Sequence, residues 1–251
     1  MKWSDEGIIL SIIPFSENEA RLSILTHSNG RQSGLYRLAK RQPSLHIGDM
    51  VSATWNARLS EHLGRFIIER NSSLASRMFN DPWKLWLLQH ACGLMITLPE
   101  RHPYPQLYIH LMNLLINITL YHDHIVFAQM THFEKITLAE LGFGIDLSMC
   151  CLNQTTEHLA YISPKTGRAI SMKAATEGDA YAYINQLLPL PPFWLTRFNH
   201  ENEETPQWSD ILNGFRVTEH FWHKWLFNDK QTFPSIRKMI ITHTEKNLIS
   251  S

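Results

Sequence analysis

The stretch from Phe133 to Ser171, FEKITLAELGFGIDLSMCCLNQTTEHLAYISPKTGRAIS, places a helix, a helix stop, a compact loop and a hairpin in succession. Apolar residues recur near helical spacing from Phe133 onward, and Gly142 stands where a left-handed C-terminal cap is needed. The runs 159–163 and 168–171 are separated by Pro-Lys-Thr-Gly, in which proline presets one turn dihedral and glycine accepts a positive one. The stretch therefore predicts a helix, its cap and a β-hairpin.

The amino-terminal part of the chain carries short apolar runs joined by turn residues. These runs cover residues 7–15, 20–26, 32–38, 50–59 and 64–70. Short strands that follow one another without helical periodicity are typical of a small closed barrel, so we predict an OB-fold, with an SH3-like barrel as the alternative.

Helical patterns replace the strand pattern at Asp81-Pro82, where aspartate can cap a helix and proline suits its first position. A proline-punctuated link then leads to residues 107–120, which are apolar enough for a central buried helix. Further helices are expected at 180–188, 208–227 and 235–244, and a solvated loop at 199–206. The predicted fold class is α+β: an OB-fold barrel in residues 1–80, then a mainly α-helical domain in residues 81–251 with a loop and hairpin inserted at 146–172.

Charge and cysteine content exclude several classes of protein. Lysine plus arginine equals aspartate plus glutamate at 23 each, but residues 1–80 carry a net charge of +3 and the remainder −3. The amino-terminal part is therefore the expected polyanion-binding face. Three cysteines are too few for a disulfide framework, the start lacks the pattern of a secretory signal, and no uninterrupted apolar span is long enough for a membrane helix. We expect a cytoplasmic protein with no membrane partner.

Five segments in order are similar to the RecO family of bacterial recombination mediators, in its alphaproteobacterial form. They are the opening DEGIIL, ATWNARLSEHLGRFIIE at 53–69, LPERHPYPQLY at 98–108, FE..T.AELGFGIDLS at 133–148 and LAYISPKTGRA at 159–169. The resemblance runs through nearly the whole chain and implies an OB-fold, a helical domain, and an inserted loop and hairpin that binds zinc in many relatives. It also implies a nucleoid-associated protein that is not an enzyme.

The function implied by the resemblance is mediation of recombinational repair in the RecF pathway. RecO-like proteins bind single- and double-stranded DNA, anneal complementary strands, contact the C-terminal tail of single-strand binding protein, and with RecR help load RecA. A protein-only adaptor that bridges RecR and single-strand binding protein is the alternative, and a hydrolase is a third hypothesis. The sequence contains no GxSxG, phosphate loop, HExxH or dinucleotide fingerprint.

Cations interleaved with aromatic rings predict where DNA would bind, because charges release counterions from phosphates and rings stack on bases. The candidate residues are Arg31, Tyr36, Arg37, Lys40, Arg41, Trp55, Arg58 and Arg65, joined by Lys165 and Arg168 beside the hairpin turn. The opposing interpretation is that strand aromatics form the barrel core and scattered arginines a solvated surface. The segment between Lys40 and Ile47 also looks shorter than the basic loop that relatives often carry, which would either weaken DNA binding or leave it to another part of the chain.

The cysteines depart from a zinc-binding pattern. A structural zinc site needs four thiolate or imidazole ligands, commonly as two CxxC pairs, whereas Cys150 and Cys151 are adjacent and only His158 follows in the hairpin. We expect no metal and no cofactor, with both cysteines buried as small apolar residues. The hairpin would then be a degenerate zinc-finger-like element held by packing through Leu152, Leu159, Tyr161 and Ile162.

Two further sets of residues have weaker patterns. The histidines near Asp123 and the pair His220 and His223 lack ligand partners at recognised intervals, so we interpret them as residues of helix faces. For the acidic tail of single-strand binding protein, the candidates are Trp222, Trp225, Arg216 and Lys224, although aromatics at helical spacing more often form core.

Overall fold

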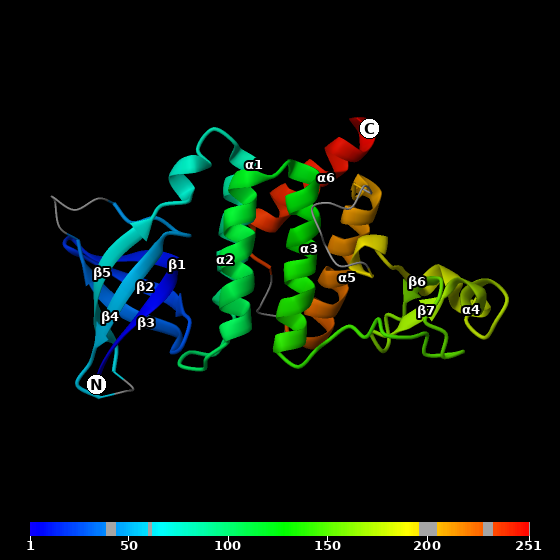
Figure 1. The fold of residues 1–251 in the computed structure, drawn as a ribbon, viewed down its shortest axis with the longest axis horizontal. Helices are drawn as coiled ribbons and strands as arrows, with labels where there is room; N and C mark the ends of the chain where they lie inside the picture. The colour runs from blue at the N-terminus through cyan, green and yellow to red at the C-terminus, as the bar shows by residue number, and fades with distance from the viewer. Residues whose placement is uncertain (39–43, 60–61, 196–204, 228–232, 251) are drawn as a thin grey trace. The chain divides into compact units, whose positions relative to one another are not determined.

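The computed structural model describes residues 1–38, 44–59, 62–195, 205–227 and 233–250 (Figure 1). The chain forms two compact units. The first contains Met1–Tyr121 with Pro234–Arg237, and the second contains His122–Phe233 with Lys238–Ser251. The predicted division at residues 80 and 81 stays a prediction about sequence domains. The first compact unit extends beyond it because helices near the boundary pack on the barrel.

Five strands close into a barrel in the first unit. They are β1 (Lys2–Ser16), β2 (Glu19–Thr26), β3 (Gly30–Arg37), β4 (Met50–Asn56) and β5 (Gly64–Ser72). Their order is β1-β2-β3-β5-β4, with β3 and β5 parallel and the other pairs antiparallel. β1 pairs with β4 through its first half and with β2 through the rest, so one long, bulged strand closes the sheet. The prediction of an OB-like barrel is confirmed.

The barrel interior is filled by alternate residues of all five strands, as strand geometry requires. Its buried members are Ile9, Ala20, Leu22, Ile24, Tyr36, Val51, Ala53, Trp55 and Phe66. Trp55 stacks on Trp3 with ring centroids 5.9 Å apart, and its indole N–H donates to the carbonyl of Ser33 at 3.1 Å. Gly64 is needed here because a Cβ at this position would lie 2.2 Å from the Trp55 ring. The indole is thus a fixed, fully packed core group.

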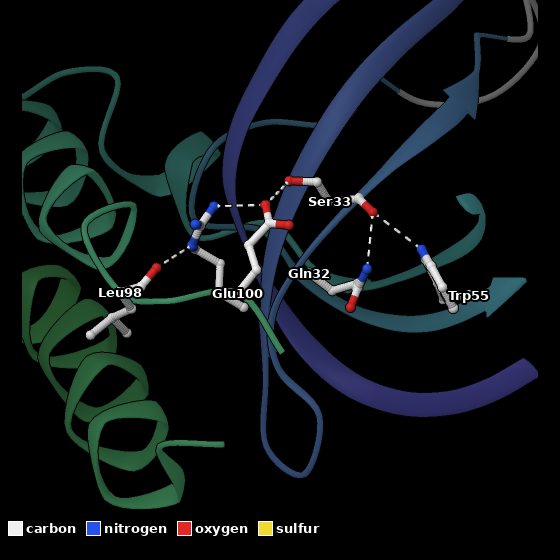
Figure 2. Close-up of polar contacts among 6 residues, drawn as sticks. Gln32, Ser33, Trp55, Leu98 and Glu100 are labelled. Atoms are coloured by element: carbon white, nitrogen blue, oxygen red, sulfur yellow. Dashed lines mark hydrogen bonds and ion pairs between the residues drawn. The ribbon is translucent and has the colours of Figure 1, made fainter. Parts of the chain in front are cut away.

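The link between α1 (Pro82–Met95) and α2 (Pro105–Leu120) is clamped to the barrel by Arg31 of β3. Its guanidinium Nε donates to the Leu98 carbonyl at 2.7 Å, and its Nη1 lies 3.1 Å from the Glu100 carboxylate. The Ser33 hydroxyl donates to the same carboxylate at 2.5 Å (Figure 2). These contacts agree with the parallel bridge between Arg31 and Glu100 and with the Arg101 N–H that donates to the Arg31 carbonyl at 2.8 Å.

Replacing Arg31 by alanine is expected to destabilise this unit by about 1–2 kcal/mol, because two acceptors at a half-buried site lose a charged donor. The measurement is the urea midpoint of unfolding. Arg58→Ala is the matched control, since Arg58 is exposed and its loss should change stability by less than about 0.5 kcal/mol. Equal midpoints for the two variants would contradict the clamp.

The second unit is built on α3 (Asp123–Glu140), α5 (Trp208–Trp225) and most of α6 (Ile236–Ser250). The α3–α5 contact is close. The Thr218 hydroxyl donates to the buried Glu134 carboxylate, and a Cβ on Gly214 would come within 3.0 Å of Thr131. The predicted helices over 107–120, 208–227 and 235–244 are therefore confirmed apart from their ends. None of the helices in the described ranges is long and apolar enough to cross a membrane.

The stop after α3 has the predicted form. Gly142 has φ +89°, its N–H donates to the Ala139 carbonyl at 2.9 Å, and the Phe143 N–H donates to the Leu138 carbonyl at 2.8 Å. These two hydrogen bonds define a Schellman motif, in which glycine supplies the left-handed residue.

The predicted hairpin is also present, and a third strand joins it. β6 (Leu159–Ile162) pairs with β7 (Ala169–Ser171) and with β8 (Leu188–Pro189), and α4 (Met172–Thr176) follows β7 directly. The short 3-10 helices are η1 (Ala75–Arg77), η2 (Tyr181–Gln186) and η3 (Pro192–Trp194). The prediction of a helix over 180–188 was therefore only partly correct, since its end forms β8. Most of the loop predicted at 199–206 lies outside the described residues.

Candidate nucleic-acid interface

The outer surface of the barrel carries a face of cations that strand register brings together. Arg21 of β2 lies opposite Leu35 of β3, which in turn lies opposite Arg65 of β5. Arg37 lies opposite Glu19 two residues along the same strands. We call these five residues the outer β2–β3–β5 face. Side chains of one row lie about 5 Å apart at Cβ in a sheet, so the three guanidiniums can follow one phosphate backbone.

Further groups extend this face on both sides. Asn56 of β4 lies opposite Arg65 and opposite Lys2 of β1, which continues the row around the barrel. On the other side, Ile13 of β1 lies opposite Arg21, and Phe15 stands two residues later at an irregularity of the β1–β2 pairing, with 60% of its surface exposed. An exposed ring beside cations is what a single-strand binding surface uses.

The net charge of this face is positive, because it carries three arginines and one glutamate. Arg65 is paired with Glu19, with 2.5 Å between guanidinium and carboxylate. Arg21 and Arg37 are exposed, and neither forms an ion pair with another residue that the structure describes. In an OB-fold, oligonucleotides bind to the face of strands 2 and 3 and to the loops after strands 1 and 4. The outer β2–β3–β5 face occupies that position.

The ten residues predicted from the sequence to bind DNA belong to different parts of the chain and differ in burial. Arg37, Arg58 and Arg65 are exposed on the barrel, and Arg58 stands in the loop after β4. Lys40 and Arg41 lie outside the described residues. Lys165 and Arg168 are exposed in the second unit, where the Arg168 Nε lies 3.6 Å from the Asp146 carboxylate. Hydrogen bonds from Ser148 and, to a smaller extent, the charge of Arg168 lower the pKa of Asp146, so the carboxylate stays charged beside Arg168.

Two predicted stacking rings lie inside the barrel. Tyr36 is 8% exposed and Trp55 is 2% exposed, and both belong to the core cluster. Burial raises the pKa of the Tyr36 hydroxyl. In the folded barrel neither ring has a face on which a base could stack, because both point inward with the other core residues. Burial here supports the opposing interpretation, that strand aromatics form the core.

Arg31 also has a structural role. Its side chain is 15% exposed and held by Leu98 and Glu100, and burial lowers the pKa of its guanidinium despite the nearby carboxylate. A residue so placed positions the barrel against the α1–α2 link and has little freedom to follow a phosphate.

Sequence reasoning missed Lys2, Arg21 and Phe15. The signal was available for Arg21, because the alternation in 20–26 that buries Ala20 and Leu22 must direct Arg21 outward. Phe15 gave no such signal, since it ends a run of apolar residues that are otherwise mostly core.

The residues predicted to bind the acidic tail of single-strand binding protein differ in burial and in their contacts. Trp222 is fully buried, and Trp225 packs on Phe221 and Phe143. The Lys224 ammonium donates to the carbonyls of Pro164 and Lys165, at 2.6 Å each, so it holds the hairpin turn against α5. Arg216 is exposed.

The cysteine region does not fit a structural zinc ion. Cys150 is fully buried, whereas Cys151 is half-buried. Within the described residues, no group of three or more histidine, cysteine or acidic side chains is placed to hold a metal. The predicted packing is confirmed for Ile162, Leu159 and Tyr161, but it was wrong for Leu152, which is 38% exposed on the turn.

Comparison with known proteins agrees with the barrel and the helical unit. The model of the family described as recombination protein O, N terminal, matches residues 1–69, and that described as recombination protein O, C terminal, matches residues 80–223. The chain is 39% identical to the DNA repair protein RecO of Methylobacterium nodulans, over 89% of this chain and 91% of the relative. It is 33% identical to the RecO of Anaplasma marginale, over 96% and 98%, and 34% identical to that of Beijerinckia indica, over 98% and 96%. Because these matches cover nearly the whole chain at more than 30% identity, the chain belongs to the RecO family of DNA repair proteins.

Proposed function

We propose that this RecO-family chain acts in recombinational repair by binding single-stranded DNA on the outer β2–β3–β5 face and annealing complementary strands. The observation that carries the proposal is the convergence of Arg21, Arg37 and Arg65 on one face of an OB-type barrel. Cations in a row neutralise successive phosphates and release their counterions, which is the main source of sequence-independent affinity. Annealing requires this type of binding, since a strand must be held by its backbone while its bases stay available for pairing.

The proposal includes the partners and place of action that the family implies. The chain would also bind double-stranded DNA, contact RecR and the C-terminal tail of single-strand binding protein, and assist RecA indirectly, in the cytoplasm at the nucleoid. It would act as an adaptor and not as an enzyme.

The direct test is duplex formation between two complementary oligonucleotides, followed by fluorescence quenching, with and without the protein at low salt. Acceleration that depends on protein concentration is expected. No acceleration under conditions where the protein is folded would exclude annealing.

A protein-only adaptor is the second candidate, and the Arg65–Glu19 pair favours it. In this pair a carboxylate of the protein already neutralises the charge of Arg65, one of the three arginines of the face. The adaptor would bind RecR and the tail of single-strand binding protein but would show little affinity for DNA. Binding of a bare single-stranded oligonucleotide, weakening steeply with salt, would exclude it.

Phe15→Ala is expected to weaken single-stranded DNA binding about fivefold or more and to leave duplex binding nearly unchanged. Base stacking on an exposed ring is worth about 1–3 kcal/mol, and only unpaired bases can reach it. Fluorescence anisotropy with oligonucleotides of both kinds measures the effect. Phe79→Ala is the matched control, because Phe79 is also 60% exposed but lies outside the barrel strands. Equal losses for Phe15→Ala and Phe79→Ala would contradict a stacking role.

A further inference from the structure

One carboxylate lies among the three arginines of the outer β2–β3–β5 face. Glu19 begins β2 and lies opposite Arg37 of β3, two residues before Arg21 on its own strand. Side chains two residues apart on a strand lie on the same face of the sheet. Ala20 between them is buried, so Glu19 and Arg21 both point to the outside of the barrel. Glu19 is therefore an acidic group within a face that otherwise attracts phosphate.

The side chain of Arg65 extends across a whole strand to reach Glu19. Arg65 belongs to β5 and Glu19 to β2, and β3 lies between these two strands in the barrel. The Arg65 Nη1 nevertheless donates to the Glu19 Oε1 at 2.5 Å, which makes a charge-assisted hydrogen bond. The guanidinium must therefore lie over the outer side of β3, where the proposed DNA strand would run.

The Arg65–Glu19 pair differs from the structural clamp formed by Arg31. Arg31 donates to the Leu98 carbonyl as well as to a carboxylate, and its side chain is only 15% exposed. Arg65 is 63% exposed, and Glu19 is its one hydrogen-bond acceptor in the part of the chain that the structure describes. An exposed ion pair contributes little to stability, because water solvates both charges after they separate. The Arg65 guanidinium can therefore exchange its acceptor at small cost.

We infer that the Glu19 carboxylate occupies the position of a backbone phosphate on Arg65, and that a bound DNA strand displaces it. This inference rests on the proposed function. Carboxylate and phosphate oxygens both match the planar fork of a guanidinium, so the two groups compete for the same donors of Arg65. After displacement, Glu19 stays on the face as a negative charge beside the strand. Both effects weaken the binding of DNA.

The consequence is that Glu19 promotes release of the strand. Differences in affinity at one interface arise mainly from the dissociation rate, so a weakening contact shortens the lifetime of the complex. A protein that anneals DNA must give up each strand once the bases have paired. Glu19 is thus a residue that sets the residence time of DNA on the barrel, and it has no need to touch the bases.

Glu19→Gln is expected to raise the affinity for a labelled single-stranded oligonucleotide about threefold at about 50 mM salt, and to slow dissociation by about the same factor. An exposed charge pair accounts for a factor of this order. Fluorescence anisotropy gives the affinity, and stopped-flow competition with unlabelled oligonucleotide gives the dissociation rate. Glu17→Gln is the matched control, because Glu17 is exposed in the turn before β2 and its loss changes the net charge equally. Equal gains for Glu17→Gln and Glu19→Gln would show a general charge effect and would overturn the inference.

A double-mutant cycle tests the competition itself. Arg65→Gln should cost about threefold more affinity in the Glu19→Gln background than in the wild type, because only there is the guanidinium free for phosphate before the strand arrives. Equal costs in the two backgrounds, with DNA binding intact, would overturn this inference and leave the proposed function standing. Absence of binding by the wild type and by every variant would overturn both. Urea midpoints show that each variant is folded.

Discussion

Replacing Arg21, Arg37 and Arg65 together by glutamine is expected to weaken single-stranded DNA binding on the order of 30-fold at about 50 mM salt. An exposed ionic contact contributes roughly threefold to affinity, and the three side chains can reach one backbone at the same time. Folding should be nearly unchanged, because these residues are on the barrel exterior and only Arg65 has an ion-pair partner among the described residues. Fluorescence anisotropy with a labelled oligonucleotide gives the affinity.

The matched control removes three exposed cations from the helical part of the chain: Lys173, Arg216 and Lys238. Both variants change the net charge by the same amount, so any general electrostatic effect is common to them. Loss of affinity in the control, with no loss in the barrel variant, would place the DNA site away from the outer β2–β3–β5 face. Lys165 and Arg168 would be the next residues to change, since both are exposed cations of the hairpin.

Trp55→Ala should destabilise the barrel by about 3–5 kcal/mol, which is a large share of the stability of a domain of this size. The substitution would leave a cavity beneath Trp3 and Gly64 and would free the Ser33 carbonyl from the indole N–H. Urea unfolding measures the loss.

Trp55→Phe keeps a ring in the core and is expected to fold. It should lose about 1 kcal/mol with the missing hydrogen bond, and the folded protein should bind DNA as the wild type does. A stable Trp55→Ala variant that binds single-stranded DNA poorly would instead show that Trp55 acts in base stacking, contrary to its buried position.

Much of the fold could be predicted because local patterns and tertiary structure agree. The Gly142 cap, the Pro-Lys-Thr-Gly turn and the alternation in β2 each depend on residues close in sequence. β8 was missed because a two-residue strand has no periodicity, and it forms only where β6 offers an unpaired edge. Residues 180–188 look helical by composition, but pairing of Leu188 with Ile162 makes their end a strand.

The candidate site was less predictable, because the sequence gives residue types and not their directions. Arg31 and Arg37 are both arginines of β3, yet one is clamped by Glu100 and the other is exposed. The partner of Arg31 lies 69 residues away in sequence, and no local pattern indicates it. Likewise, Tyr36 and Phe15 are both strand aromatics, and only closure of the barrel decides which ring faces solvent.

Binding of single-stranded DNA as a function of salt tests most directly whether the barrel binds DNA. Affinities of the wild type and the Arg21, Arg37 and Arg65 variant would be measured between about 50 and 200 mM salt, where the logarithmic slope is about −0.7 per phosphate contacted. We predict a slope for the wild type that corresponds to several phosphates, and a slope for the variant that is shallower by about 2, since three contacts are lost. Identical slopes, or no measurable binding by the wild type at low salt, would contradict the proposed function.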